Sequence, residues 1–152
     1  MEPLDLESRP PRGPREQLLG FCFLPRTIDK IRAELPGGKI GGYLVAESTM
    51  SSYLLHKIGV KLEELRDVVA RAANENEVVE WLRERVDPAV AEQVNAKLAN
   101  SSIADAPPEK QQLIRDRHPV LADRPDVVNA FEMLELDDAR TGAKTSSRSS
   151  PA

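Results

Sequence analysis

The residues best suited to chemistry lie between positions 26 and 43 of this chain. Arg26, Asp29 and Lys30 are three and four residues apart, so a helix over this stretch places them on one face. Two cations beside one carboxylate form the edge of an anion site, where Arg26 and Lys30 would donate charge-assisted hydrogen bonds. Tyr43 would close this site, and Asp29 would orient Arg26 or act as a base. The alternative is a solvated helical face, which is the commoner arrangement and whose exposed ion pairs contribute only about 0–1 kcal/mol.

His56 is a second candidate for acid–base chemistry, because the pKa of an imidazole lies near neutral pH. A surface histidine without a catalytic role is the alternative. We predict Asp29 and His56 as catalytic residues. The predicted ligand-binding residues are Arg26, Lys30 and Tyr43.

Other catalytic and cofactor motifs are absent from the sequence, which predicts neither a cofactor nor a metal site. Two histidines and one cysteine are too few for a Cys/His zinc site. Lys39 follows two glycines, but Ile40 stands where a P-loop needs serine or threonine. Cys22 lies between two phenylalanines and is expected in the core as a small hydrophobe.

Length and composition indicate one domain with a real core. The chain has 152 residues and a net charge of −4, which argues against a general nucleic-acid binder. It has no secretory signal pattern and no apolar run near the roughly 20 residues that span a membrane. We expect a cytoplasmic protein whose partner is a small anionic molecule or another protein.

Apolar periodicity predicts an all-α fold, a compact bundle of six to eight short helices with a Gly-rich loop and disordered tails. Pro14 would begin a helix that runs to about Leu24. Pro25 would begin the next helix, because proline suits the first helical position, or it would kink one continuous helix. The Gly-rich loop at 36–42 would end that helix, either as a C-cap and turn or as a loop whose amides meet an anion.

Capping residues predict where the later helices begin. The predicted starts are Ser48 or Thr49, Leu62, Asn74 or Asn76, Asp87-Pro88, Pro107-Pro108, and Asp123 with Pro125. The expected organisation is an extended arm over 1–13 anchored by Leu4 and Leu6, a single helical domain over 14–138, and a disordered Ser/Thr-rich tail over 139–152.

Four segments resemble a bacterial domain of unknown function, DUF family 5069. The most specific is Leu24–Ala33, with the sequence LPRTIDKIRA, and the others are Pro10–Arg15, Gly42-Tyr43 and the acidic turn Asn76–Trp81. The resemblance covers about residues 4–100, leaving 101–138 as a helical extension. In such a family an acidic residue is expected after the tyrosine, and here it is Glu47. The resemblance implies a fold and a site location, not a reaction.

Two functions remain open from the sequence. In the first, the domain binds a small anionic metabolite, with or without processing it, through the Arg26, Asp29 and Lys30 cluster. In the second, it is a non-catalytic interaction or accessory module whose charges hold helices in register or meet a partner. The first requires the cluster to face a concavity, and the second requires a flat charged face.

Overall fold

The computed structural model describes residues 1–46 and 49–149, with side chains described through Thr141. This part of the chain holds eight α-helices and one small hairpin, so the predicted multi-helix fold is confirmed. The hairpin strands are β1 (Gln17–Leu18) and β2 (Phe21–Cys22). The helices are α1 (Leu24–Ala33), α2 (Met50–Ile58), α3 (Leu62–Arg71), α4 (Glu75–Arg83), α5 (Ala91–Ala99), α6 (Pro108–Arg117), α7 (Val120–Asp123) and α8 (Ala130–Ser149).

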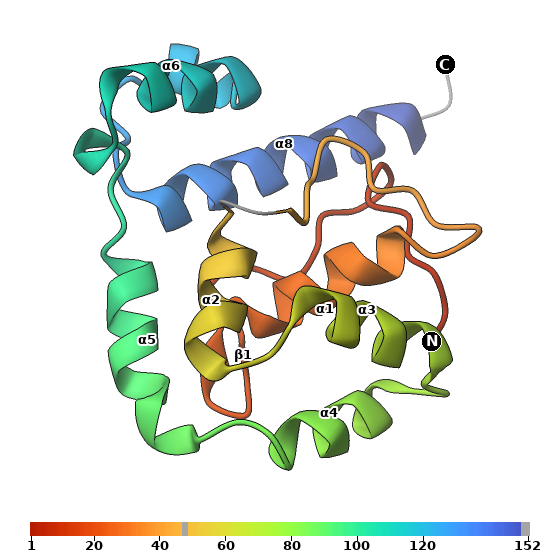
Figure 1. Cartoon of the computed structure of the whole chain (residues 1–152). Coiled ribbons are helices and arrows are strands. Elements are labelled where there is room, and N and C mark those ends of the chain that lie inside the picture. The colour runs from red at the N-terminus through yellow and green to blue at the C-terminus, as the bar shows by residue number, and fades with distance from the viewer. Residues whose placement is uncertain (47–48, 150–152) are drawn as a thin grey trace.

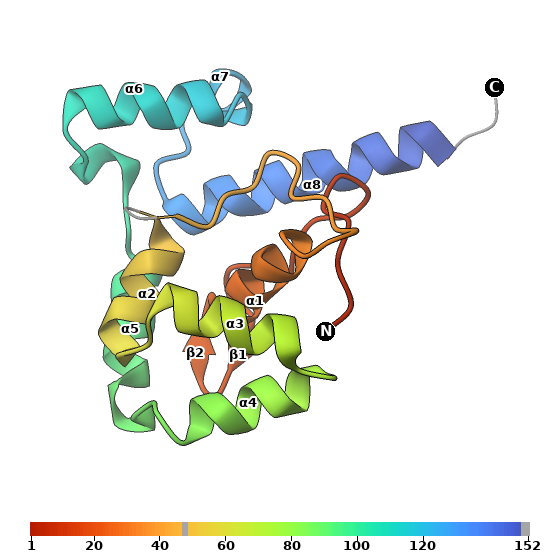
Figure 2. The same ribbon diagram turned by 45° about the vertical axis from the view of Figure 1, so that its right-hand side comes forward.

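The long helix α8 separates two parts of the molecule. Figures 1 and 2 show the hairpin and α1 to α5 on one side of α8, with α6 and α7 on the other side. The N-terminal arm passes α1 and approaches α8 before the chain enters the hairpin (Figure 2). Three segments far apart in sequence therefore surround α1: the arm, the loop after α1, and α8.

The predicted helix over 14–24 is wrong, because the chain forms the β1–β2 hairpin there. Leu18 pairs with Phe21, which leaves a two-residue turn of Leu19 and Gly20. Both turn residues have positive φ, 53° and 83°, as the commonest two-residue hairpin turns require. Phe23 also has a positive φ, so the chain turns sharply before Pro25 occupies the first turn of α1, as predicted.

Capping chemistry locates α2 and α4 as the sequence predicts. The side chain of Thr49 accepts from the backbone N–H of Ser52 at the start of α2, and Gly59 ends this helix with a φ of 74°. The Asn74 side chain likewise caps α4 by accepting from the backbone N–H of Glu77. Ser48, the other predicted cap, lies outside the described residues, as does Glu47.

The last helix begins later and extends further than predicted. Asn129, not Asp123, lies before it, and the Asn129 side chain accepts from the backbone N–H of Glu132. The backbone is helical through Ser149, where a disordered tail is predicted from residue 139. The helix meets no proline before Pro151, and its alanines, lysine and arginines are good helix formers. Residues 150–152 lie outside the described residues.

Apolar side chains form a main core and a smaller second one. The main core joins the hairpin, α1 to α5 and α8, and includes Phe21, Phe23, Leu24, Ile28, Leu54, Leu65, Leu82, Leu98 and Phe131. The second lies around α7 and the start of α8, and includes Ile103, Val120, Leu121, Val127 and Met133. Cys22 lies in the main core, as predicted, and the arm residues Leu4 and Leu6 are buried against Ala33.

Candidate functional site

Helix α1 is buried around almost its whole circumference, including its charged side chains. Arg26, Asp29 and Lys30 are 1%, 5% and 6% exposed. The interpretation of these charges as a solvated face is therefore wrong. Buried charges are stable only when they are paired and hydrogen-bonded, so the partners of each side chain decide what the cluster can do.

Arg26 binds a carboxylate from the far end of the chain. Its two terminal nitrogens donate to the two oxygens of Asp138 in α8, at 2.7 Å and 3.1 Å. One of them also donates to the backbone carbonyl of Arg12 at 3.3 Å. This two-pronged arrangement is the geometry with which arginine recognises carboxylates. The Arg26 Nε is buried and has no hydrogen-bond partner within the described part of the chain.

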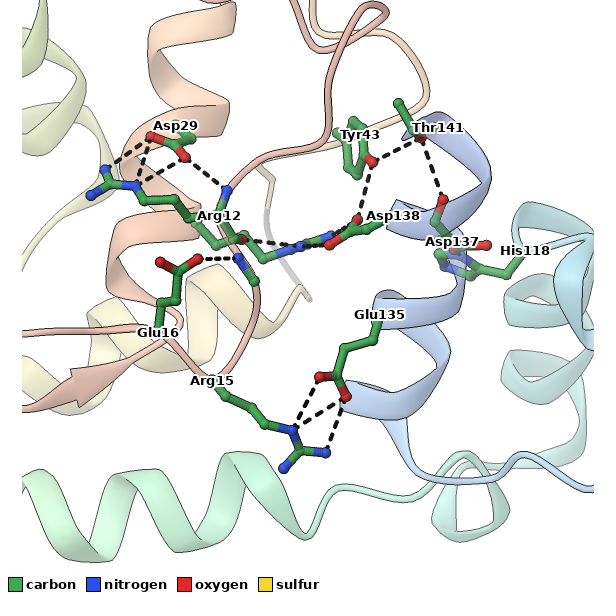
Figure 3. Close-up of polar contacts among 12 residues, drawn as sticks. Arg12, Arg15, Glu16, Asp29, Tyr43, His118, Glu135, Asp137, Asp138 and Thr141 are labelled. Atoms are coloured by element: carbon green, nitrogen blue, oxygen red, sulfur yellow. Dashed lines mark hydrogen bonds and ion pairs between the residues drawn. The ribbon is translucent and has the colours of Figure 1, made fainter. Parts of the chain in front are cut away.

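Tyr43 completes the surroundings of Asp138. Its hydroxyl donates to the same Asp138 carboxylate at 3.1 Å and lies 3.1 Å from the Thr141 hydroxyl. Figure 3 shows Asp138 pointing from α8 toward Tyr43, with Thr141 one turn further along the helix. Burial raises the pKa of Tyr43 to about 12, so the hydroxyl keeps its proton at neutral pH and remains a donor.

Lys30 is a buried amine beside another cation. Its Nζ donates to the backbone carbonyl of Leu44 at 3.1 Å and lies 5.1 Å from the centroid of the Phe23 ring. Burial, and next the positive charge of Arg26, lower the pKa of Lys30 to about 7. A substantial fraction of this amine is therefore neutral at physiological pH.

Asp29 faces away from Arg26 in its interactions. Its carboxylate accepts from the backbone N–H of Arg12 at 2.8 Å and from the Arg12 guanidinium at 2.9 Å. The same guanidinium also pairs with Glu75 at the start of α4. Arg12 thereby joins the arm, α1 and α4, and these hydrogen bonds raise the pKa of Arg12 against the opposing effect of burial.

The structure therefore brings together three of the five predicted site residues. Arg26, Lys30 and Tyr43 share one cluster, with Arg26 Cζ 5.5 Å from the Tyr43 ring centroid. Asp29 serves the separate Arg12 contact. His56 is exposed on α2 and takes part in none of the contacts described for the cluster.

Sequence analysis missed the two residues that partner the predicted site, Asp138 and Arg12. Arg12 lies in a segment assigned to an extended arm. Asp138 continues the stripe of Phe131 and Leu134 at helical spacing, so it occupies a position that faces the core. A carboxylate on such a stripe is the signal that it has a buried cationic partner.

An open hollow lies away from this cluster, between α1 and α3. Its volume is about 470 Å³, and neither Arg26, Lys30 nor Tyr43 lines it. Its lining residues are Ile31, Glu34, Leu35, Glu63, Arg66, Asp67 and Ala70. The cluster is instead closed by Asp138 and the loop that carries Tyr43, so it faces neither a concavity nor a flat charged surface.

Comparison with protein families gives one match. A family model described as a domain of unknown function, DUF5069, matches residues 8–140. The chain belongs to this family. The DUF5069 match includes α6, α7 and Asp138, so the segment over 101–138 is part of the family domain rather than an extension of it. A comparison with curated proteins found no match.

Two kinds of feature are absent from the described residues of this DUF5069 protein. No helix there is both long and apolar enough to cross a membrane. Within the same residues, no three histidine, cysteine, aspartate or glutamate side chains are grouped so as to hold a metal ion.

Proposed function

We propose that this DUF5069 protein binds a small anion at the cluster of Arg26, Lys30 and Tyr43. In this proposal the anion takes the place of the Asp138 carboxylate, which occupies the site in the free protein. The observation that carries the proposal is the buried Arg26 Nε, which has no acceptor in the described part of the chain. A guanidinium that is 1% exposed and lacks one acceptor is costly unless another group satisfies it.

The charge balance of the cluster supports this proposal. Arg26 and Lys30 are both buried, and Asp138 is the carboxylate that contacts Arg26. Arg117 of α6 is near enough to lower the pKa of Lys30 further, whereas Asp138 and Glu34 raise it. An incoming anion that replaces the Asp138 carboxylate would keep negative charge where positive charges crowd one another.

Tyr43 and Arg26 define how such an anion would be held. The two terminal nitrogens of Arg26 and the Tyr43 hydroxyl would donate to the anion, as they now do to Asp138, and a further oxygen of the anion would accept from the Arg26 Nε. The proposed roles of Asp29 and His56 differ from this. Asp29 keeps Arg12 and the arm in place, and His56 has no part in anion binding.

The experiment is a thermal-shift screen of carboxylates and phosphates on the wild type and on Asp138→Asn. A ligand at a hundredfold excess over its Kd stabilises a protein by about 2.7 kcal/mol. Asp138→Asn removes the internal competitor while keeping its shape, so we expect the same ligands to bind this variant more tightly.

Two variants control this screen. Arg26→Lys keeps the charge but loses the two-pronged geometry, so it should lose most of the shift. Arg71→Ala removes an exposed arginine of α3 and should behave as the wild type does. If no carboxylate or phosphate shifts either the wild type or Asp138→Asn, the proposal fails.

The hollow between α1 and α3 favours a second candidate, an interaction module. Ile31, Leu35 and Ala70 line it together with charged residues, so it presents apolar and polar surface side by side. Ala70→Arg would fill the hollow from an exposed position. A binding partner recovered with the wild type and with Arg71→Ala, but lost with Ala70→Arg, would support this candidate.

A further inference from the structure

We propose that Lys30 forms an imine with a small 2-oxo acid whose carboxylate is held by Arg26. This inference rests on the anion site proposed above and specifies its substrate class. The site would then bind its ligand at two points, one ionic and one covalent.

The position of Lys30 beside Arg26 is the first observation that supports this proposal. Lys30 lies one helical turn after Arg26, and both cationic groups lie beside the same aromatic ring. Lys30 Nζ is 5.1 Å and Arg26 Cζ is 5.8 Å from the centroid of Phe23. The charges of Arg26 and Asp138 both act on the Lys30 amine, so in the proposed complex a ligand that replaces the Asp138 carboxylate on Arg26 extends its next atoms toward Lys30.

The compactness of the cluster limits the size of the ligand. The space now filled by the Asp138 side chain is what becomes free when that carboxylate leaves, so the ligand must be small. A 2-oxo acid has its carbonyl carbon one bond from its carboxylate, which is the shortest linkage between the group that Arg26 recognises and the group that an amine attacks.

The environment of Lys30 suits a nucleophilic amine. In the described residues Lys30 forms no salt bridge, and its hydrogen bond is to the neutral carbonyl of Leu44. The charged groups that act on it are Arg26 on α1, Arg117 on α6, Asp138 on α8 and Glu34 after α1. Desolvation and a neighbouring cation are the two means by which proteins activate a lysine for imine formation.

The proposed step balances without any oxidant or reductant. The Nζ lone pair attacks the carbonyl carbon while the carbonyl π electrons move to oxygen. The carbon–oxygen bond then breaks, the oxygen leaves as water with the two protons of the amine, and a carbon–nitrogen double bond forms. Tyr43 stays protonated at neutral pH and is available to donate a hydrogen bond to the departing oxygen.

The test is reductive trapping on the full chain. The protein is incubated with pyruvate at pH 7, sodium borohydride reduces any imine to a stable secondary amine, and peptide mapping by mass spectrometry locates the label. We expect Lys30 to be labelled at least about tenfold faster than exposed Lys39 and Lys57, because its neutral fraction is far larger than that of an ordinary lysine. Acetate should slow the labelling, and acetone, which has no carboxylate, should label Lys30 poorly.

The outcomes separate this inference from the anion site. Labelling of Lys30 no faster than Lys39 or Lys57, or equal labelling by pyruvate and acetone, would overturn it. If pyruvate raises the melting temperature but Lys30 stays unlabelled, the anion site stands and imine formation fails. If pyruvate and the other anions give neither a shift nor a label in the wild type and Asp138→Asn, both fail. Lys30→Met should lose the label while remaining folded, because methionine matches the buried length of the side chain.

Discussion

Helix α1 carries two ionic contacts that differ in how completely their groups are satisfied. In the first, Asp29 accepts three kinds of hydrogen bond from Arg12, and Arg12 also pairs with Glu75. In the second, Arg26 pairs with Asp138, but its Nε has no hydrogen-bond partner among the residues that the structure describes. The first contact has a carboxylate on each side of its arginine. The second has a buried arginine beside a buried lysine.

This difference separates a structural contact from a reactive one. The Arg12 contact ties the arm to α1 and α4 and leaves no cation in excess, because its one guanidinium meets the two carboxylates of Asp29 and Glu75. Beside the Arg26 contact, burial and next the charge of Arg26 lower the pKa of Lys30 to about 7. The Arg26 Nε has no acceptor within the described residues. Arg26 and Asp29 lie three residues apart on α1 but have different roles, because α8 supplies the partner of Arg26 and the arm supplies the partner of Asp29.

The largest expected effect comes from breaking the second contact. Asp138→Ala leaves the charge of Arg26 buried without a counter-charge, which should lower the free energy of unfolding by about 3–5 kcal/mol. Urea unfolding followed by circular dichroism measures it. The double variant Arg26→Met/Asp138→Leu removes both charges and should recover most of the loss. A loss for Asp138→Ala no larger than the loss for Arg12→Ala would show that the two contacts do not differ.

A pH titration examines Lys30 within the second contact. Lys30 has a pKa of about 7 in the folded state and 10.5 as its ordinary value. Below pH 7 the amine is charged in both states, and the burial penalty is fully present. Between pH 7 and 10.5 the folded state loses its proton first, so the unfolding free energy should rise with pH by roughly a few kcal/mol.

Lys30→Met provides the reference for this titration. It removes the group that titrates, so the rise should be absent from its profile over the same pH range. Parallel profiles for the wild type and Lys30→Met would contradict the lowered pKa. Tyr43 acts in the opposite direction, but between pH 10 and 12, largely beyond the Lys30 window.

Removing the first contact should have a smaller effect. Arg12→Ala deletes the donors to Asp29 and Glu75, but the Arg12 side chain is 32% exposed and water can replace part of the loss. We expect a decrease of about 1–3 kcal/mol in the free energy of unfolding, the usual range for hydrogen bonds to charged groups. Anion binding should be retained, and its loss in Arg12→Ala would connect the two contacts.

The smallest expected effect is that of an exposed pair. Arg71 and Asp67 lie one turn apart on α3, with side chains 73% and 63% exposed. Arg71→Ala should change the free energy of unfolding by only about 0.3–0.5 kcal/mol. It is the reference against which the three larger changes are measured, by the same urea titration.

Local signals predicted most of the helices. The caps at Thr49 and Asn74 act through bonds within a few residues, so they can be read from a short stretch. The hairpin was missed because the Leu19-Gly20 turn requires a leucine with positive φ, which its sequence does not favour. Tertiary packing of the apolar residues on both sides overrides that preference.

The part of the site that lies close together in sequence was predicted, and the distant part was not. Arg26, Lys30 and Tyr43 lie within 18 positions, and helical spacing with a loop accounts for their meeting. Their burial depends on α8 and on the arm, which helical spacing does not reveal. The partner of Arg26 is 112 residues away, so no local pattern on α1 could distinguish a solvated arginine from a buried one.

The sequence separation of Arg26 and Asp138 also affects the order in which parts of the protein can fold during synthesis. Asp138 and the core residue Phe131, whose ring lies 5.9 Å from that of Phe23, both belong to the last helix. At translation rates of roughly 5–20 residues per second, the 112 residues between Arg26 and Asp138 take about 5–20 s to make. Throughout that interval the nascent chain exposes its basic cluster and an incomplete core. We therefore expect the ribosome-bound chain to be the form in which this cluster is most open to anions and chaperones.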